Sequence, residues 1–294
     1  MFRILITGAK GFIGSHLISK LQDRHELFAL GRHLNLEGQS PVQWIEQNLV
    51  QTLDRSRLPD RLDAIIHLAQ SRHYREFPEQ AKDIFDVNIH GTFQLLEYAR
   101  QAGVRCFIFA SSGGVYGYSY ERFFETDPVN PLNFYLSSKY TAELLLANYQ
   151  SYFKTVVLRF FFVYGSDQKG MLIPNLLSKV MRGELITIEG DPGPRINPIY
   201  VEDAIRVFEP ALGLHASTLF NVAGEEAVTL TDLVNLIGKA AIRRPKIHYR
   251  ANHVSGDLIG DNKRMKEVLK VLPKVSLLEG LRAMVKSTEG EGEK

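Results

Sequence analysis

After Met1 the chain reads Phe2-Arg3-Ile4-Leu5-Ile6-Thr7-Gly8-Ala9-Lys10-Gly11-Phe12-Ile13-Gly14. Its apolar first half predicts a strand, the glycines predict a turn, and the pattern from Ser15 to Leu21 predicts a helix. Such a unit places backbone N–H groups where a pyrophosphate binds. The spacing is Gly-x-x-Gly-x-x-Gly rather than the usual Gly-x-Gly-x-x-Gly, so a plain turn is the alternative. We predict a dinucleotide-binding turn formed by Gly8, Lys10, Gly11, Phe12, Ile13 and Gly14.

The next predicted strand, Leu27 to Leu30, is followed by Gly31 and Arg32. In a dinucleotide fold this position faces the adenosine ribose, where an acid would accept from the 2′-hydroxyl of NAD and an arginine suits the 2′-phosphate of NADP. Lys10 adds a second positive charge nearby. We therefore expect NADP as the cofactor, with NAD as the alternative and a solvated Arg32 as the reading without a ligand.

Further apolar strands are predicted at Val42 to Glu46, Asp63 to Ala69 and Cys106 to Ala110, with helical patterns between them. Continuous apolar strands that alternate with helices are typical of a parallel sheet covered on both faces. We therefore predict an α/β fold with a doubly wound parallel sheet. His67 lies inside one of these strands and is expected to be a hydrogen-bonded core residue.

Composition narrows the function classes. The 294 residues are 45% hydrophobic and 23% charged, with a formal net charge of +2, and no long basic block suggests nucleic acid as a partner. No apolar run reaches the roughly 20 residues of a membrane span, and the chain opens on a strand instead of a signal peptide. The single Cys106 forms no internal disulfide, and no cluster has metal-ligand spacing. We expect a cytoplasmic protein that uses neither a metal nor a membrane.

A tyrosine and a lysine are spaced for proton chemistry. Tyr135 and Lys139 lie four residues apart in a helical pattern, so both can face the same cleft. A fixed ammonium favours the phenolate and would lower the pKa of Tyr135 toward working pH. An ordinary amphipathic helix is the alternative.

Ser111 and Ser112 follow the predicted strand that ends at Ala110, at the edge where open α/β sheets bind ligands. Ser112, Tyr135 and Lys139 are therefore a candidate catalytic triad.

Asn88 lies in the middle of a predicted amphipathic helix, roughly Pro78 to Ala102. Asparagine is a poor helix former, which suggests that its amide is used inside the protein. A proton-relay role and structural bracing both remain open.

Several spaced motifs, in this order, resemble the extended short-chain dehydrogenase/reductase superfamily, in particular the NAD(P)-dependent epimerase/dehydratase family of nucleotide-sugar enzymes. The resemblance runs nearly end to end and is therefore specific. The motifs are Gly8-x-x-Gly11-x-x-Gly14, His67-Leu68-Ala69, Val87-Asn88-x-x-Gly91-Thr92, Ser111-Ser112 before Val115-Tyr116-Gly117, Tyr135-x-x-x-Lys139, Leu158-Arg159 before Val163-Tyr164-Gly165, and Tyr200-Val201-Glu202-Asp203.

The resemblance implies roles for these residues. Ser112 would be the catalytic hydroxyl and Tyr135 the acid/base, while Lys139 would hold the nicotinamide ribose and lower the Tyr135 pKa. Beyond the glycine turn, Arg32, Tyr135 and Lys139, the implied cofactor-binding residues are Asn48, Leu49, Leu68, Ala69, Asn88, Ser111, Phe160 and Phe161. The implied substrate-binding residues are Ser112, Phe162 and Arg195.

Departures from the family pattern bear on the reaction. The Asp-Glu pair of the 4,6-dehydratases is replaced by Gly113-Gly114, which argues against dehydration. The asparagine that helps the family hold a sugar diphosphate is Phe162 here, and an arginine expected to reach that diphosphate is Arg195, for which a solvated loop residue is the alternative. The aspartate common after the third strand is Asn48.

The resemblance also implies a domain division. An NAD(P)-binding Rossmann domain is expected over residues 1–165, with a returning segment at about 196–223, and a smaller substrate-binding domain over residues 166–195 and 224–294. In many relatives the helices corresponding to those from Pro78 and Tyr135 form a dimer, which makes a homodimer an expectation here.

We predict an NADPH-dependent reductase of a nucleotide-linked 4-keto-sugar. Two alternatives are an epimerase with tightly bound NAD and a non-catalytic NADP-binding sensor.

Overall fold

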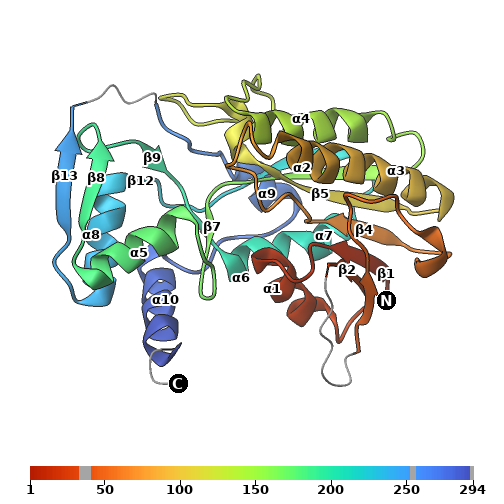
Figure 1. The fold of residues 1–294 in the computed structure, drawn as a ribbon, viewed down its shortest axis with the longest axis horizontal. Helices are drawn as coiled ribbons and strands as arrows, with labels where there is room; N and C mark the ends of the chain where they lie inside the picture. The colour runs from red at the N-terminus through yellow and green to blue at the C-terminus, as the bar shows by residue number, and fades with distance from the viewer. Residues whose placement is uncertain (33–40, 252–255, 292–294) are drawn as a thin grey trace. The chain divides into compact units, whose positions relative to one another are not determined.

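The computed structural model describes residues 1–32, 41–251 and 256–291, with the side chains of residues 289–291 excepted. Its centre is a seven-stranded sheet in the order β11-β6-β5-β4-β1-β2-β3 (Figure 1). The pairings that run from β3 through β2, β1 and β4 to β5 are all parallel, as predicted. The strands are β1 (Arg3–Thr7), β2 (Glu26–Gly31), β3 (Gln43–Glu46), β4 (Ala64–His67), β5 (Cys106–Ser112), β6 (Lys154–Phe160) and β11 (Thr218–Val222).

Helices cover both faces of this sheet, so the predicted doubly wound α/β fold is confirmed (Figure 1). One face carries α3 (Gly91–Gln101) and α4 (Phe134–Ala147), and the other carries α1 (Phe12–Leu21) and α7 (Phe208–Leu212). The central strands are buried on both sides because each is a run of apolar residues. Strand order reverses between the neighbours β1 and β4, the switch point at which such sheets bind ligands.

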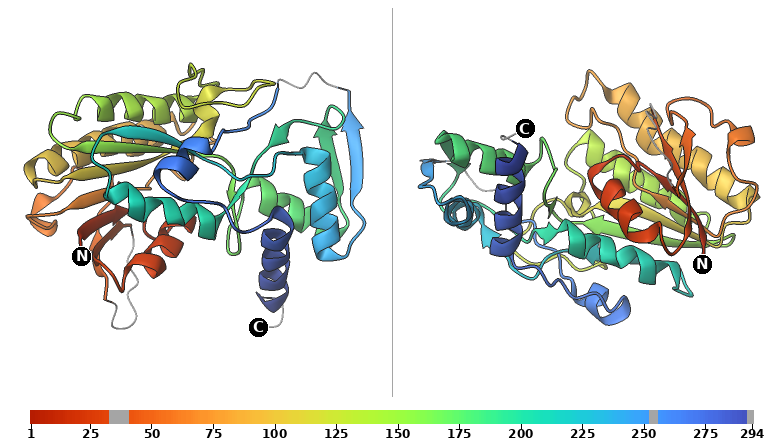
Figure 2. Two further views of the ribbon diagram at one scale, coloured as in Figure 1. Left: turned by 180° about the vertical axis from the view of Figure 1, so that it is seen from behind. Right: turned by 90° about the horizontal axis from the view of Figure 1, so that it is seen from below.

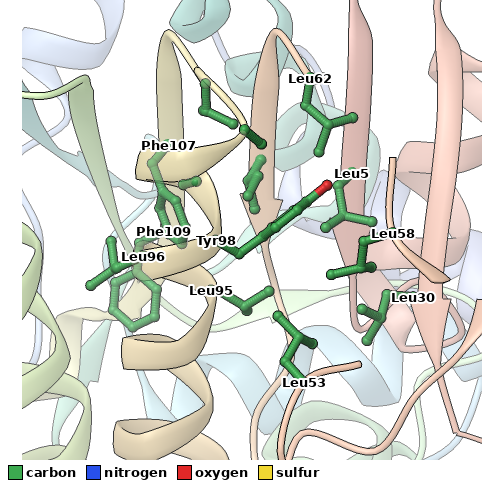
Figure 3. Packing of buried hydrophobic residues seen from close by; sticks show 14 of the residues in the cluster. Leu5, Leu30, Leu53, Leu58, Leu62, Leu95, Leu96, Tyr98, Phe107 and Phe109 are labelled. Atoms are coloured by element: carbon green, nitrogen blue, oxygen red, sulfur yellow. The ribbon is translucent and has the colours of Figure 1, made fainter. Parts of the chain in front are cut away.

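The core between the sheet and α3 is closely packed. In Figure 3 the side chain of Tyr98 extends from α3 toward Leu5 of β1, and Leu96 lies beside Phe109 of β5. The Tyr98 hydroxyl donates to the Pro59 carbonyl at 2.5 Å, which satisfies the polar end of this buried ring. This packing fixes the carboxyl ends of the strands, where the candidate site lies.

The predicted helix from Pro78 to Ala102 differs in the structure. It begins later, with α2 (Ala81–Phe85), and is interrupted by a π-helical turn, η2 (Asp86–His90), before α3. The turn contains Asn88, whose carbonyl accepts from the Thr92 hydroxyl at 2.6 Å. Such bulges are common at functional sites.

Backbone contacts divide the chain into two compact units. The first comprises residues 1–115, 129–159 and 208–220, and the second residues 116–128, 160–207 and 221–294. The second unit has its own core, formed by α5 (Leu172–Arg182), α8 (Leu230–Ala241) and α10 (Leu277–Glu291) with the parallel strands β8 (Leu185–Glu189) and β13 (Lys246–Arg250) (Figure 2). Its role in substrate binding, and with it the division at residues 165 and 223, stays a prediction.

Shorter elements complete the second unit. Strands β7 (Val163–Tyr164) and β10 (Ile199–Tyr200) pair in parallel, and β9 (Arg195–Ile196) pairs antiparallel with β12 (Val228–Thr229). Two short helices are α6 (Val201–Ala204) and α9 (Lys263–Val268). Within the described ranges, no helix has both the length and the apolar character needed to cross a membrane.

Candidate active site

The glycine turn after β1 is packed too tightly for side chains at two positions. Gly8 has a left-handed backbone with φ of 68°, and a Cβ there would lie 2.7 Å from the Ala69 nitrogen. A Cβ on Gly14 would lie 2.3 Å from the Gly8 carbonyl oxygen. The Gly11 N–H closes the turn by donating to that same oxygen at 2.8 Å. The turn therefore holds the start of α1 against the ends of β1 and β4.

This turn fits the pyrophosphate of a dinucleotide. Helix α1 starts directly after Gly11, and among the described residues no side chain caps it and no acidic residue lies in its first turn. The first N–H groups of a helix have no partner within the helix, and the helix dipole favours an anion there. Phe12, Ile13 and Gly14 supply that first turn, so the helix begins three residues before its predicted start at Ser15.

The other predicted cofactor residues follow strand ends along the same sheet. Arg32 comes directly after β2, and Leu68 and Ala69 follow β4, where the Ala69 N–H donates to the Thr7 hydroxyl at 3.2 Å. The Lys10 ammonium lies 5.7 Å from the Trp44 ring centroid, a cation–π distance. After β3, Leu49 is buried, and the Asn48 side-chain oxygen accepts from the Val50 N–H at 3.2 Å. Their contacts with a cofactor stay predictions.

His67 is a core histidine, as expected. Its ring nitrogens lie 2.6 Å from the Thr7 hydroxyl and 2.9 Å from the Thr92 hydroxyl. Burial, with a smaller contribution from the Lys139 charge, lowers the pKa of His67 to about 3, so the ring is neutral.

The candidate triad is carried by β5 and α4. The side chain of Asn133 caps α4 by accepting from the Leu136 N–H at 2.9 Å, which places Tyr135 in the first turn. The Lys139 ammonium donates to the Ala110 carbonyl at 2.6 Å, two residues before Ser112. The Ser112 hydroxyl accepts from the Gly114 N–H at 3.1 Å.

Gly114 also brings the serine loop against the start of α4. A Cβ on Gly114 would lie 2.8 Å from the Leu136 side chain and 3.3 Å from the Ser112 hydroxyl. A side chain at that position would displace the end of the Leu136 side chain. All three triad residues thus belong to the first unit.

The prediction that the Tyr135 pKa is lowered was wrong for the protein without a bound ligand. Burial raises the pKa of Tyr135, and Tyr74, whose ring centroid is 5.0 Å away, adds to the effect. Lys139 is only 2% exposed, and burial lowers the pKa of its ammonium to about 7, against the opposing charge of Glu143. The spacing indicated the pair, but not the burial that shifts the pKa of each group.

Asn88 braces α4. Its side-chain oxygen accepts from the Ser71 N–H at 2.8 Å, and its amide donates to the Ser138 hydroxyl at 2.9 Å. Of the two roles left open by the sequence, the hydrogen bonds support bracing. A contact between Asn88 and a cofactor stays a prediction.

The remaining predicted residues lie in the second unit. Phe160 ends β6, and Phe161 is buried against Tyr116, at a ring-centroid distance of 6.3 Å. Phe162 has a left-handed backbone with φ of 43°, unusual for a bulky side chain and suited to asparagine. The Arg195 guanidinium pairs with the buried Asp257 at 2.7 Å. A role of these residues in binding stays a prediction.

Comparison with known proteins identifies the family. Residues 4–223 match the model described as the NAD dependent epimerase/dehydratase family. The chain belongs to this family. The predicted family and the prediction of an NAD(P)-dependent enzyme of this type are therefore confirmed.

Members of the epimerase/dehydratase family resemble the chain over most of its length. It is 29% identical to an uncharacterized UDP-glucose epimerase of Bacillus subtilis, over 95% of each chain. It is 30% identical to the UDP-glucose 4-epimerase of Erwinia amylovora, over 81% of this chain and 82% of that one. A crystal structure of the UDP-glucuronic acid 4-epimerase of Bacillus cereus, in complex with UDP-glucuronic acid and NAD, superimposes with a TM-score of 0.88 at 26% identity, covering 98% of this chain and 99% of that chain.

Two features of this epimerase/dehydratase chain were missed from sequence. Gln70 accepts a hydrogen bond from the Tyr135 hydroxyl at 2.9 Å, and only its position just after β4 pointed to the site. Glu143 binds Arg159 and Ser111, and its spacing of four residues from Lys139 was the available signal. Among the described residues, no group of three or more His, Cys, Asp or Glu side chains is placed to hold a metal ion.

Proposed function

We propose that this chain is a nucleotide-sugar 4-epimerase that retains NAD and inverts the C4 hydroxyl of a UDP-hexose. The observation that carries the proposal is the position of the Tyr135 hydroxyl. This hydroxyl donates to Gln70, and the partly exposed Tyr135 lies one helical turn from the buried Lys139, in the same unit as the Ser112 loop and the glycine turn. Relatives with this architecture include epimerases whose structures contain NAD and a UDP-sugar.

The residues have distinct tasks in this reaction. The glycine turn at Gly8, Gly11 and Gly14 would hold NAD, which would supply a hydride acceptor and donor for the sugar carbon. Tyr135 takes the proton of the sugar hydroxyl and later gives it back, exchanging its hydrogen bond to Gln70 for one to the sugar oxygen. The Ser112 hydroxyl binds the same oxygen, and the Lys139 ammonium stabilises the phenolate that forms.

NADPH-dependent reduction of a keto-sugar is the second candidate. It is favoured by one observation, the arginine directly after β2 in the position that meets the 2′-phosphate of NADP. The cofactor named in the similar structure is NAD, which favours the epimerase. A non-catalytic sensor would need neither a tyrosine nor a buried lysine, so their presence argues against it.

Mass spectrometry and product analysis test the proposal. Denaturing the purified protein should release NAD in near-stoichiometric amount. Incubation with UDP-glucose and no added cofactor should yield UDP-galactose, detected by NMR. Consumption of NADPH with a 4-keto-sugar, together with no UDP-glucose conversion, would instead support the reductase.

We infer that two copies associate through α3 and α4. Apolar side chains on these helices and on α2 are exposed, with Phe85 at 49%, Phe93 at 44% and Leu144 at 51%. An exposed apolar face of this kind is typical of a protein interface. The substrate is the other expected partner.

The predicted effect of a charge in this face is dissociation. Phe93→Glu should shift the protein from dimer to monomer in sedimentation experiments at micromolar concentration, because a charge would have to be buried unpaired. Ile242→Glu, at a 91% exposed position in the second unit, should remain dimeric. A monomeric wild-type protein would refute the inference.

A further inference from the structure

A buried carboxylate lies one helical turn beyond Lys139. Glu143 of α4 is 7% exposed and accepts hydrogen bonds from two neighbouring strands. The Ser111 hydroxyl of β5 donates at 2.5 Å, and Arg159 of β6 donates through Nε at 3.1 Å and Nη2 at 2.6 Å. One carboxylate therefore joins the helix that carries Tyr135 to the strand that carries Ser112. We call Glu143, Ser111 and Arg159 the carboxylate clamp.

A second hydrogen bond also joins α4 to β5. The Lys139 ammonium donates to the carbonyl of Ala110, the residue before Ser111. Two consecutive residues of β5 are thus bound to two residues of α4 that lie one turn apart. Ser112 follows directly on the strand, and Tyr135 precedes by one turn on the helix. These two hydrogen bonds between α4 and β5 therefore set the distance between the Ser112 and Tyr135 hydroxyl groups. Proton transfer requires that distance to be fixed within a narrow range.

The clamp also determines the charge around Lys139. Glu143 acts on Lys139 from the same helix, while the Ala110 carbonyl and the Phe109 ring approach it from β5. His67 of β4 interacts with the ammonium but is neutral. Arg159, only 4% exposed, adds a second buried cation from β6. Both buried cations lie near this one carboxylate, so removing it takes away a negative charge that compensates them.

We propose that Glu143 is a positioning residue for the reaction, which, with Ser111 and Arg159, fixes Ser112 relative to Tyr135 and supplies the negative charge that faces the Lys139 ammonium. The proposal rests on the proposed function of the triad. Glu143 itself touches no reacting atom.

Glu143→Gln removes the negative charge of the Glu143 side chain while keeping its size and shape. We expect kcat to fall by about 10²-fold, the cost of a small misplacement of catalytic groups, with a much smaller change in KM. Without the carboxylate, the pKa of Lys139 moves further below its ordinary value, so the ammonium is neutralised at lower pH. The alkaline limb of the kcat profile should therefore shift to lower pH.

Glu97→Gln is the matched control. Glu97 of α3 also binds an arginine through two hydrogen bonds, to Arg100 at 3.3 and 3.0 Å, but lies away from the triad. It should leave kcat and the pH profile unchanged. Ser111→Ala removes one clamp bond and no charge, so kcat should fall by about tenfold while the pH profile stays in place. If Glu143→Gln does not fold, Ser111→Ala tests the proposal in its place. A wild-type kcat in Ser111→Ala would overturn the proposal.

A readout without turnover separates this proposal from the proposed function. NMR of ¹⁵N-lysine protein, with the Lys139 signal assigned by its loss in Lys139→Met, follows the titration of the ammonium directly. Its midpoint should move to lower pH in Glu143→Gln and not in Glu97→Gln. If the Lys139 midpoint shifts but the wild-type protein shows no epimerase activity, the proposed function is wrong and the role of Glu143 beside Lys139 stands. A folded Glu143→Gln protein with unchanged midpoint and kcat would overturn the role of Glu143.

Discussion

Tyr135→Phe should lower kcat of epimerisation by about 10³-fold, because the variant lacks the group that takes and returns the proton. The fold should persist, since the ring is kept and only the hydrogen bond to Gln70 is lost, at a cost of about 1 kcal/mol in the free energy of unfolding. Bound NAD, measured after denaturation, should remain at the wild-type amount.

Tyr152→Phe is the control for this variant, because Tyr152 is a tyrosine of the same unit that is 62% exposed. Its kinetics should match those of the wild type. A Tyr135→Phe protein that kept kcat within about tenfold of the wild-type value would show that another group transfers the proton.

Gly14→Ala should destabilise the protein by about 3 kcal/mol and abolish retention of the dinucleotide. The added methyl group would lie 2.3 Å from the Gly8 carbonyl oxygen and 2.8 Å from the Ala9 Cα, and both are backbone atoms that a rotamer change cannot move. Helix α1 would have to move away from β1, which opens the turn that receives the pyrophosphate. Urea unfolding and the amount of released dinucleotide measure the two effects.

Gly213→Ala makes the same chemical change where space is available. Its Cβ would lie 3.5 Å from the Pro210 carbonyl oxygen, an ordinary contact, so stability should change by less than about 0.5 kcal/mol. A Gly14→Ala protein with wild-type stability and a full load of dinucleotide would contradict the structure of the turn.

The sheet could be predicted because each central strand is a short apolar run next to a turn or a helix. The helix patterns were also informative, and the helix predicted from Ser15 to Leu21 ends at the same residue as α1, Leu21. The π-turn at Asp86–His90 could not be predicted, since it accompanies hydrogen bonds between Asn88 and residues 17 and 50 positions away. Strand β13 was missed because its residues Lys246 to Arg250 are mostly polar and exposed, and only pairing with β8 makes them a strand.

At the site, sequence spacing predicted which residues would act but not their surroundings. The spacing of four residues between Tyr135 and Lys139 can be read from the sequence. The burial that raises the Tyr135 pKa depends on packing against other elements. Gln70 reaches Tyr135 across 65 residues of sequence. The prediction of NADP over NAD rested on Arg32 and the nearby Lys10, and two basic side chains are too little to decide it.

UDP-glucose that carries deuterium at C4 provides the most direct measurement. The purified protein, given this substrate and no added dinucleotide, should form UDP-galactose that still carries its deuterium at C4, because the hydride returns to the sugar from which it came. Formation of product without the label, or no product unless NADPH is added, would contradict an epimerase that recycles its own NAD.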